Sequence, residues 1–525
     1  MLPGPRNLVV QVSVKGGETI PLSIPLTLPA VLDVSKDGTE FLVASNVLAN
    51  QVGLEPIPLW VQPVAGGSPQ RVGAILVADA WFGPDAATIV YSDGHSINQV
   101  GTDGSSPRKL LSMDDHPSGF GSAPFAFRFS PDGRVFRFTQ YDGQLDRFSV
   151  AYASRFSSIM EAKADGRKLR KMFPGCCGEW TSDGQFFIFQ NRTNFAFDLW
   201  AFREQRRFLG SKKLDEPVQL TSGPLDFEFP LPSKDGKEIF AVGTSRRAEV
   251  VRYDSHSGAF VPYLSGISAE GLSFSRDGQW VTYTAYPEGT LWRSRVDGSQ
   301  RAQLTFPPLR VFWPRWSPDG KRIAFSATLP NTTLNAYLIS SEGGNAQQIL
   351  PSKQIQMDVN WSPDGNSLIF GSLPFRNAPI YTIDLSTKRV SSFARFKWVL
   401  FPHWSPDGRH ISAITMANRT LMLFDVSSQK WTEAFGSAMG WENWSHDGKY
   451  IYFLDHHDPA QGFGYRVVRL RLSDRKTESI VDIKNIGRLT TGMFASSFGL
   501  APDDSPLFAR DISTQEIYAL ELQRP

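Results

Sequence analysis

A column of polar and charged side chains recurs at one fixed position of a repeated sequence unit. The position lies four residues before an aspartate that anchors the unit, and it holds acids, bases, amides and a hydroxyl. Side chains of these types can exchange protons with a ligand or form hydrogen bonds to it. The column comprises Asp33, Arg128, Glu179, Ser273, Arg315, Asn360, His403 and Asn443.

Two further carboxylates, Glu228 and Glu270, precede their anchors by seven residues on neighbouring units. A carboxylate pair performs acid–base chemistry only in a matched cavity, so we interpret both as ligand contacts rather than as a catalytic pair. An alternative interpretation, in which the polar side chains pair with one another and with water to hold neighbouring units together, is favoured over direct ligand contact. The predicted ligand-binding set is Arg128, Glu179, Glu228, Glu270, Arg315, Asn360, His403 and Asn443.

The clearest metal-like cluster is Asp455-His456-His457-Asp458. Imidazole and carboxylate groups bind metals, but adjacent side chains in one loop rarely converge without a distant third ligand. We therefore expect a solvated turn, no metal and no cofactor. The sequence has no H-E-x-x-H motif, and the segments beginning at Gly94 and Gly266 lack the second glycine of a G-x-S-x-G elbow. No catalytic residue is predicted.

The two cysteines, Cys176 and Cys177, are adjacent. Two cysteines exclude a disulfide framework and a multi-cysteine zinc site. A vicinal disulfide or a thiol switch is one interpretation of the pair. The favoured interpretation is two small buried residues that lead into a strand ending at Trp180.

The element that must position these side chains is a repeat of 40 to 56 residues. Its clearest copies carry aromatic-Ser-Pro-Asp-Gly, as at Trp316–Gly320, Trp361–Gly365 and Trp404–Gly408. A repeat of this length indicates one supersecondary unit that is copied many times. The eleven anchors are Asp37, Asp85, Asp132, Asp183, Asp235, Asp277, Asp319, Asp364, Asp407, Asp447 and Asp503.

Each unit is predicted to form four antiparallel strands. Asp-Gly is a strong hairpin signal, and alternating apolar residues follow it, as in Lys321–Ser326. A third strand, a Gly- or Ser-rich turn and a short fourth strand complete about 45 residues, which is the pattern of a β-propeller blade. No window has the periodicity of a long amphipathic helix. The predicted fold class is all-β, with eleven four-stranded blades.

An aromatic residue stands three positions before most anchors. Large rings bury much apolar area and can wedge between neighbouring sheets, so this column is predicted to be structural. Adjacent strand residues face opposite sides, so the polar column should border a central channel. The aromatic column comprises Phe82, Phe129, Trp180, Phe274, Trp316, Trp361, Trp404 and Trp444.

Eleven blades exceed the usual number in one ring, so two propellers of about five and six blades are expected. We place them at residues 29–265 and 266–525, with a cut near Ser265 and an N-terminal segment at 1–28. The last unit ends after its third strand, so Leu8–Val14 is predicted to supply the fourth and close the ring. That pairing would nest one propeller in the other, an arrangement that the sequence leaves open.

Composition limits the choice of partners. The chain has 41% apolar residues, and its 54 basic and 52 acidic residues give a net charge of +2. Such a balance gives no field that would gather nucleic acid or anionic lipid. The most basic stretch, Arg203–Lys213, is interpreted as a solvated loop. We expect a protein or peptide partner, with a small ligand as the alternative, and neither nucleic-acid binding nor membrane insertion by this chain.

The sequence contains no run of 18 apolar residues and no basic-then-apolar leader at Met1. A cytoplasmic location is therefore expected for the chain as it stands. A periplasmic location is expected if the chain is a fragment of a membrane-linked protein.

The repeated WSPDG units resemble those of TolB-like propellers, which also occur in the tricorn and dipeptidyl-peptidase propellers. Four stretches are more narrowly similar to the C-terminal region of acidobacterial CadC-type regulators, in which a winged helix and usually a membrane segment precede the propeller. This chain lacks both of those elements, and the resemblance implies no catalytic residues. The four stretches are Pro217–Pro224, Tyr263–Gly271, Tyr286–Trp292 and Leu500–Pro506.

Two functions from different classes therefore compete. The favoured one is a non-enzymatic scaffold or sensor that binds its partner at the channel mouth, which in a CadC-type protein would be the sensory region. The alternative is a propeller hydrolase or lyase with its site in the channel.

Overall fold

The computed structural model describes most of the chain. The described residues are 9–27, 29–45, 57–85, 87–113, 124–141, 157–193, 196–204, 216–330, 332–350, 355–373, 380–393, 399–415, 419–436, 438–456, 465–483, 486–487, 489 and 498–522. All regular elements in these residues are β-strands. The all-β prediction is therefore confirmed.

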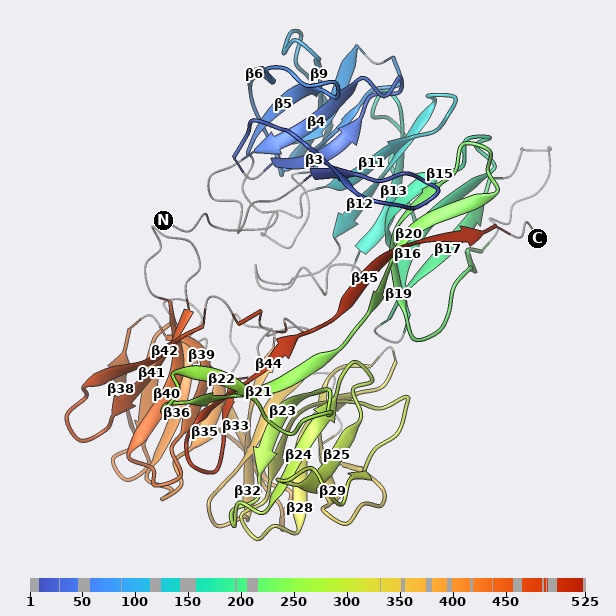
Figure 1. Ribbon diagram of the computed structural model, residues 1–525. Helices are drawn as coiled ribbons and strands as arrows, with labels where there is room; N and C mark the ends of the chain where they lie inside the picture. Colours follow the sequence, from blue (N-terminus) through green and yellow to red (C-terminus); the bar gives the residue numbers. More distant parts are fainter. Residues whose placement is uncertain are drawn as a thin grey trace. The chain divides into compact units, whose positions relative to one another are not determined.

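Eleven blade-like antiparallel sheets are present in the described residues, ten with four strands and one with three (Figure 1). The β-propeller architecture is confirmed by these sheets. The chain divides into two compact units, and unit 2 takes most of the chain from Arg246 to Thr514, while unit 1 holds the residues up to Ser245 and from Gln515 onward.

Unit 1 contains five of the described blades. Their inner strands, β3, β7, β11, β15 and β19, contact one another in that order. The strands are β3 (Pro29–Val34), β4 (Glu40–Ser45), β5 (Ile57–Pro63) and β6 (Gln70–Val77); β7 (Asp79–Phe82), β8 (Thr88–Ser92), β9 (Ser96–Gly101) and β10 (Arg108–Ser112); β11 (Phe125–Phe129), β12 (Val135–Tyr141), β13 (Ser157–Lys163) and β14 (Arg170–Pro174); β15 (Cys176–Trp180), β16 (Phe186–Thr193), β17 (Ala196–Arg203) and β18 (Val218–Gln219); and β19 (Asp226–Pro232), β20 (Glu238–Ser245) and β45 (Thr514–Glu521).

Unit 2 contains the other six described blades. Their inner strands, β23, β27, β31, β35, β39 and β43, contact one another in order, and β43 also contacts β23, so the ring is closed. The strands are β23 (Ala269–Phe274), β24 (Trp280–Ala285), β25 (Leu291–Arg295) and β26 (Ala302–Gln303); β27 (Arg310–Trp316), β28 (Arg322–Thr328), β29 (Asn335–Ser340) and β30 (Gln347–Gln348); β31 (Ile355–Trp361), β32 (Ser367–Leu373), β33 (Ile380–Asp384) and β34 (Val390–Phe393); β35 (Val399–Trp404), β36 (His410–Thr415), β37 (Leu421–Asp425) and β38 (Lys430–Phe435); β39 (Ala438–Trp444), β40 (Tyr450–His456), β41 (Tyr465–Arg471) and β42 (Thr477–Asp482); and β43 (Phe498–Leu500), β44 (Pro506–Asp511), β21 (Ala248–Asp254) and β22 (Ala259–Pro262).

The closing strand predicted at Leu8–Val14 is wrong. Within that segment the described strand β1 (Val9–Gln11) pairs with β2 (Ile20–Leu22) in a separate two-stranded sheet. The last blade is instead completed by β21 and β22, because β21 pairs with β44 from Ala248↔Asp511 to Arg252↔Leu507. The repeat anchored at Asp235 is thereby shared between two sheets, and the division falls after Ser245 rather than near Ser265.

The recurring Ser-x-Asp-Gly sequence forms one hydrogen-bonded turn. At Ser405 the hydroxyl donates to the Asp407 carboxylate at 2.6 Å and accepts the backbone N–H of His410 at 2.9 Å. The same carboxylate accepts the N–H of Arg409 at 3.0 Å, and Gly408 has a φ of 72°, which favours glycine. The turn connects the first strand to the second, so the motif is explained by the fold.

Most of the inner strands contain a β-bulge that turns side chains toward new directions. In these strands the residue six positions before the anchor is left-handed, as at Asp358 with a φ of 49° and Phe401 with a φ of 54°. The strand register shifts across this point, between Met357 and Asn360 in β31. Bulges bend a strand and re-aim its side chains. The bulge therefore determines the direction in which polar side chains of these strands point.

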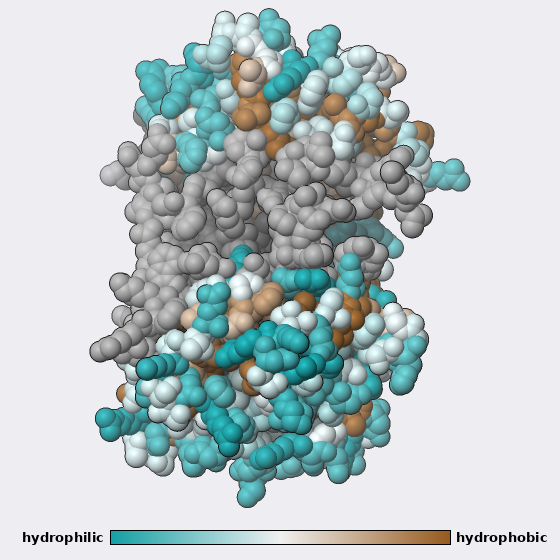
Figure 2. All heavy atoms as spheres, turned by 90° about the vertical axis from the view of Figure 1, so that its left-hand side faces the viewer, coloured by the Kyte–Doolittle hydropathy of each residue, from teal (hydrophilic) through white to brown (hydrophobic). Residues whose placement is uncertain are grey.

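The aromatic column lies in the interior between blades. Trp361 packs with Val359, Leu368 and Phe370 against Ala324 of the preceding blade. Phe82, Trp180, Trp316 and Trp361 are buried, and Phe129, Phe274, Trp404 and Trp444 are half-buried. Figure 2 shows hydrophilic residues over much of the coloured surface on one side, with hydrophobic residues in smaller groups. No helix in the described part of the chain is long and apolar enough to cross a membrane.

Candidate functional site

The inner strands of unit 2 bring two predicted residues, Arg315 of β27 and His403 of β35, to one carboxylate between them. Asp358 of β31 accepts a hydrogen bond from Arg315 Nη2 at 3.2 Å through Oδ1. Its other oxygen, Oδ2, lies 2.6 Å from His403 Nε2. Three consecutive blades are therefore joined by a single buried carboxylate.

Both ring nitrogens of His403 face acceptors. Nε2 faces Asp358, and Nδ1 lies 2.8 Å from the backbone carbonyl oxygen of Glu442 on β39. A carbonyl can only accept, so Nδ1 carries a proton and Nε2 shares a second proton with the carboxylate. His403 and Asp358 are both buried, with side chains 7% and 4% exposed. The histidine, on β35, thus links the blade that contains β31 to the blade that contains β39.

Glu442 adds a buried carboxyl group next to this network. Its side chain is 0% exposed, and neither carboxylate oxygen has a hydrogen-bond partner among the described residues. Burial raises the pKa of Glu442 well above its ordinary value of 4.5, and the charge of Asp358 acts in the same direction. The surroundings of Glu442 therefore favour its protonated form.

The pKa of Asp358 is shifted in the opposite direction. Burial acts to raise its pKa, but the charges of His403 and Arg315 and the hydrogen bond from His403 outweigh burial and hold the pKa below its ordinary value of 3.8. The network thus favours the ionised form of Asp358 and the protonated form of Glu442. Environments that separate two carboxyl groups in this way are typical of functional sites, although structural ion-pair networks produce them too.

The inner strands of unit 1 hold a second polar cluster. Arg128 of β11 forms an ion pair with Glu179 of β15, and its guanidinium lies 4.1 Å from the centre of the Trp81 ring. Asp33 of β3 accepts the N–H of Phe82 at 3.0 Å. These contacts join each blade to the next one along the chain.

A third acid, Asp79 of β7, extends this cluster. Its Oδ2 accepts the N–H of Ala126 at 2.7 Å, and its side chain is buried. Burial raises the pKa of Asp79 to about 7 and that of Asp33 to about 6, although backbone N–H donors and the charge of Arg128 act in the opposite direction. Unit 1 therefore contains two carboxyl groups that titrate within two units of neutral pH.

The remaining predicted residues lie on inner strands but outside the two clusters. Asn443 Nδ2 donates to the Trp441 carbonyl oxygen at 2.9 Å, and Asn360 is half-buried on β31. Glu228 lies in unit 1 and Glu270 in unit 2, so neither ring contains both carboxylates. Ser273 accepts the N–H of Trp316 at 3.2 Å.

Asp455 is the one member of the predicted metal-like cluster whose side chain the structure describes. Asp455 Oδ2 accepts two hydrogen bonds from Arg466, at 2.8 and 3.0 Å. His456 ends β40, while His457 and Asp458 lie outside the described residues. No group of three or more His, Cys, Asp or Glu side chains in the described ranges could hold a metal ion.

Sequence reasoning missed Asp79, Asp358 and Glu442. Asp79 and Asp358 each stand six residues before an anchor, and Glu442 stands five before one. The other residues in the column five before the anchor are apolar or glycine, so a glutamate there is a detectable signal. For Asp358 and Glu442 the bulge was the missing information, because it decides which of these positions approach each other.

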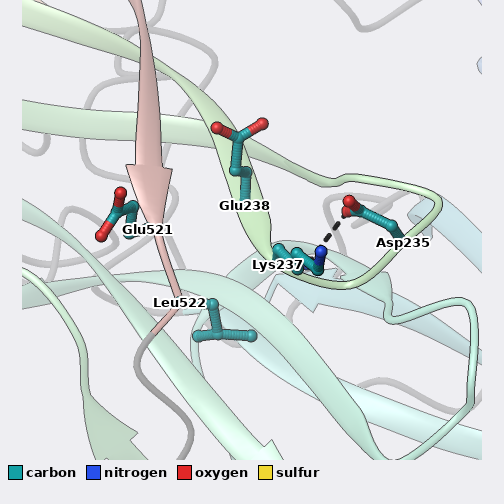
Figure 3. Close-up of a pocket in the computed structure, with 5 residues that line it drawn as sticks. All are labelled: Asp235, Lys237, Glu238, Glu521 and Leu522. Atoms are coloured by element: carbon teal, nitrogen blue, oxygen red, sulfur yellow. Dashed lines mark hydrogen bonds between the residues drawn. The ribbon is translucent and has the colours of Figure 1, made fainter.

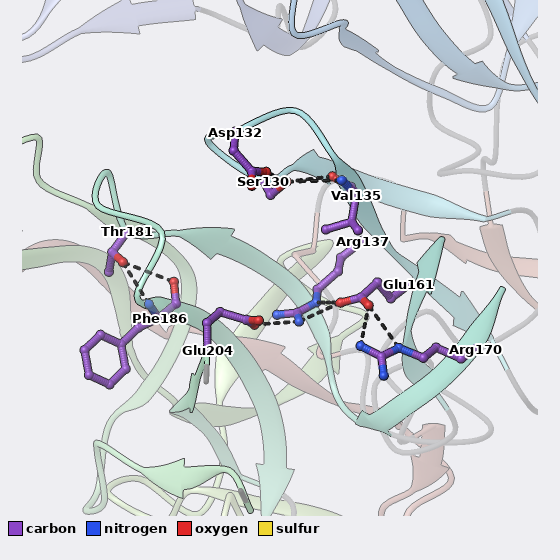
Figure 4. A network of polar contacts seen from close by, with 9 residues as sticks. All are labelled: Ser130, Asp132, Val135, Arg137, Glu161, Arg170, Thr181, Phe186 and Glu204. Atoms are coloured by element: carbon purple, nitrogen blue, oxygen red, sulfur yellow. Dashed lines mark hydrogen bonds and ion pairs between the residues drawn. The ribbon is translucent and has the colours of Figure 1, made fainter. Parts of the chain in front are cut away.

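A charged network in unit 1 serves packing rather than ligand contact (Figure 4). The Arg137 side chain of β12 is 0% exposed, and it pairs with Glu161 at 2.7 Å and with Glu204 at 2.6 Å. The guanidinium also lies 4.3 Å from the centre of the Trp180 ring. Because Glu204 follows β17 in the next blade, Arg137 joins two sheets. Arg170 supplies a second cation to Glu161 at 2.5 Å.

A pocket of about 430 Å³ lies in unit 1 beside the end of β45 (Figure 3). Two of its polar residues, Asp235 and Lys237, belong to a hairpin turn, in which the backbone N–H of Lys237 donates to the Asp235 carboxylate at 3.1 Å. The lining has no histidine, cysteine or serine. The lining residues are Asp235, Lys237, Glu238, Glu521 and Leu522.

Comparison with known proteins agrees with the propeller class. Residues 267–461, fewer than half of the chain, match the family model described as PD40, TolB beta propeller domain. An uncharacterized protein of Agrobacterium fabrum is 25% identical over 26% of this chain and 52% of its own length. An uncharacterized peptidase of Bacillus subtilis is 27% identical over 39% of this chain and 29% of its own length.

Among solved structures, a putative TolB from Agrobacterium tumefaciens is 19% identical, with a TM-score of 0.42 over 51% of this chain and 99% of that chain. The chain spans about half the length, or less, of the curated relatives described above.

Proposed function

We propose that the chain is a non-enzymatic β-propeller module that binds a protein, a peptide or a small ligand at the channel of unit 2. One observation carries the proposal. Arg315 is 21% exposed while its guanidinium is held by the buried Asp358. Its contacts in the described residues, to Asp358 and to the Pro314 carbonyl oxygen at 3.5 Å, use two of its five N–H donors.

A fixed guanidinium with unused donors suits a carboxylate or a peptide carbonyl. The planar fork recognises two acceptor atoms at once, and little side-chain entropy is lost because Asp358 already orients it. Asn360 and Asn443, half-buried on neighbouring inner strands, offer neutral hydrogen-bonding groups. This chemistry favours a peptide or a small carboxylic acid.

Within this function, we place the module as the sensory region of a membrane-linked transcriptional regulator. The four sequence stretches similar to CadC-type regulators support this placement. In such a protein the propeller would report occupancy of its channel to a separate DNA-binding domain. A membrane-anchored parent protein would then place the propeller in the periplasm.

The alternative function, a propeller enzyme, draws on the His403–Asp358 pair and the protonated Glu442. A histidine and a neutral carboxylic acid are the usual components of acid–base catalysis. Their burial argues against this role, because His403 and Glu442 have almost no surface that a substrate could touch. Binding at Arg315 does not require a ligand to reach these two side chains, because the Arg315 side chain is itself 21% exposed.

The experiment is a peptide array probed with the full chain, with each peptide present as free acid and as C-terminal amide. Arg315→Gln is expected to weaken binding to the free acids at least about tenfold, the loss of one charged hydrogen-bonded contact. Arg409→Gln is the matched control, because Arg409 is 80% exposed in a turn.

If Arg315→Gln lowers the melting temperature and leaves binding unchanged, the network only holds blades together and the proposal fails. Turnover of a bound peptide that requires His403 would establish the enzyme instead.

A further inference from the structure

The adjacent cysteines of unit 1 have sulfur atoms that face each other. Neighbouring residues of a regular strand point to opposite sides, but Cys177 has a φ of 57° and lies in the bulge of β15. The bulge brings the two side chains together, and the sulfur atoms lie 2.9 Å apart as free thiols. Cys176 is buried and Cys177 is half-buried.

We propose that Cys176 and Cys177 form a redox-active vicinal dithiol, which small-molecule disulfides oxidise to an intramolecular disulfide. This site is separate from the channel of unit 2 and does not depend on the function proposed there. The geometry points to it because the bulge pre-positions both sulfur atoms, and the two residues differ in access to solvent.

The reaction consists of two thiol–disulfide exchanges. The Cys177 thiolate attacks one sulfur of a small disulfide, forms a mixed disulfide and releases one thiol. Cys176 then loses its proton and attacks the Cys177 sulfur, which releases the second thiol. Two protein thiols and one small disulfide become one protein disulfide and two small thiols, so atoms and electrons balance.

The order of attack follows from exposure. Cys177 has access to a reagent, whereas Cys176 is enclosed. The contact with Cys177 and burial raise the pKa of Cys176 well above its ordinary value of 9.0, which disfavours Cys176 as the first nucleophile. Cys177 is therefore the attacking residue and Cys176 the resolving residue.

The site lies where three blades of unit 1 meet. The N–H of Cys177 donates to Thr139 Oγ1 of the preceding blade at 3.0 Å. Cys176 pairs in register with Gln190, whose side-chain oxygen accepts the N–H of Phe229 in the following blade at 2.7 Å. Closing the ring between the two cysteines changes the backbone at these contacts. Oxidation is therefore expected to alter the stability of unit 1.

A vicinal disulfide is also easy to reverse. The Cα atoms of adjacent residues are about 3.8 Å apart. That spacing is shorter than the range found in ordinary disulfides, and departures from it make the bond more reducible. The pair is therefore suited to cycling between two states rather than to permanent cross-linking.

The test treats the full chain with oxidised glutathione and follows intact mass and free thiols. The wild type is expected to lose two thiols and the mass of two hydrogens, to carry no glutathione, and to recover with dithiothreitol. Cys176→Ser should trap glutathione on Cys177, because no resolving thiol remains. Cys177→Ser should stay unmodified, because Cys176 is enclosed.

Thermal unfolding provides a second measurement. Oxidation should shift the melting transition of unit 1 in the wild type, while the same treatment of Cys177→Ser should produce no shift. The proposal is overturned if the folded wild type keeps both thiols or accumulates the mixed disulfide. It is equally overturned if the chain forms disulfide-linked dimers, or if Cys177→Ser reacts as fast as Cys176→Ser.

Discussion

At the scale of single residues, unit 2 contains a carboxyl group where its other blades have apolar side chains. The position five residues before the anchor holds Glu442 in the blade that contains β39. In four of the other blades it holds Leu272, Pro314, Val359 and Pro402. Burying an ionised carboxylate without a partner is costly, so burial raises the pKa of Glu442 and favours its neutral form. The adjoining Asp358 is ionised because Arg315 and His403 surround it. The surroundings of each carboxyl group in this network therefore decide which protonation state is favoured.

The first prediction concerns Glu442 and pH. Its pKa is raised in the folded state, so the folded chain binds the proton more tightly than the unfolded chain. The resulting stabilisation is complete below the unfolded pKa of 4.5 and is lost as pH rises toward the folded pKa. Glu442→Gln should remove this loss, worth about 1.4 kcal/mol for each pH unit between the two values. Denaturant unfolding from pH 5 to pH 8 measures it.

Exposed Glu433 provides the control for that measurement, because Glu433→Gln changes a surface carboxyl group that lacks the burial on which the effect of Glu442 depends. Parallel curves for the wild type and Glu442→Gln would show that the carboxyl group is ionised or solvated in the folded chain.

The second prediction concerns Asp358, whose pKa is depressed. Its stabilisation is present above the unfolded pKa of 3.8 and is lost as pH falls through the folded pKa. Asp358→Asn should cost about 3 kcal/mol or more at pH 7, because it leaves Arg315 and His403 without their buried partner. The cost should shrink on acidification. Combining it with His403→Asn should give a smaller loss than the sum of the single losses, which a double-mutant cycle checks.

At the scale of elements, the inner strands of the blades carry both the aromatic residues of the core and the residues of the polar clusters. Its hairpin, its aromatic residue and its place in a blade follow from sequence periodicity and from Asp-Gly turns, so the fold was predictable. The left-handed residue in the bulge was not, because residues as different as Asp358, Phe401 and Trp441 adopt it. The contact between Arg315 and His403 through Asp358 depends on that conformation, so only part of the site could be predicted.

The third prediction tests the aromatic column. Trp361 is 5% exposed, packs between blades, and donates its Nε1–H to the Arg315 carbonyl oxygen at 3.0 Å. Trp361→Ala should destabilise unit 2 by about 3–5 kcal/mol. Trp361→Phe keeps most of the ring volume and loses the hydrogen bond, so its cost should be nearer 1 kcal/mol, about that of one hydrogen bond. Equal costs in chemical denaturation would contradict an interior dominated by ring packing.

At the scale of the whole molecule, the chain leaves unit 1, forms unit 2 and returns. The strand β44 pairs with β21 in the last blade of unit 2, and β45 then joins β20 in unit 1. The repeat pattern alone predicted an N-terminal closing strand, because the pattern does not show which segment supplies a missing strand. In the structure the internal strands β21 and β22 complete the last blade. That choice is decided by pairing between segments that are distant in sequence, and local propensity carries no information on it.

The last prediction follows from this return. On β45, Tyr518 packs edge-to-face on Phe227 at 5.7 Å, and a Cβ added at Gly243 would come within 2.5 Å of the Tyr518 ring. Ile517, the neighbouring residue, is 62% exposed. Tyr518→Ala should therefore destabilise unit 1 by about 3 kcal/mol, and Ile517→Ala by less than about 0.5 kcal/mol.

Calorimetry should show two transitions, because two compact units need not unfold as one. Only the transition of unit 1 should move in Tyr518→Ala, while Trp361→Ala identifies the transition of unit 2. A shift of both transitions together would mean that the two units unfold cooperatively, and an equal effect of the two β45 substitutions would mean that this strand does not pack through its Tyr518 face.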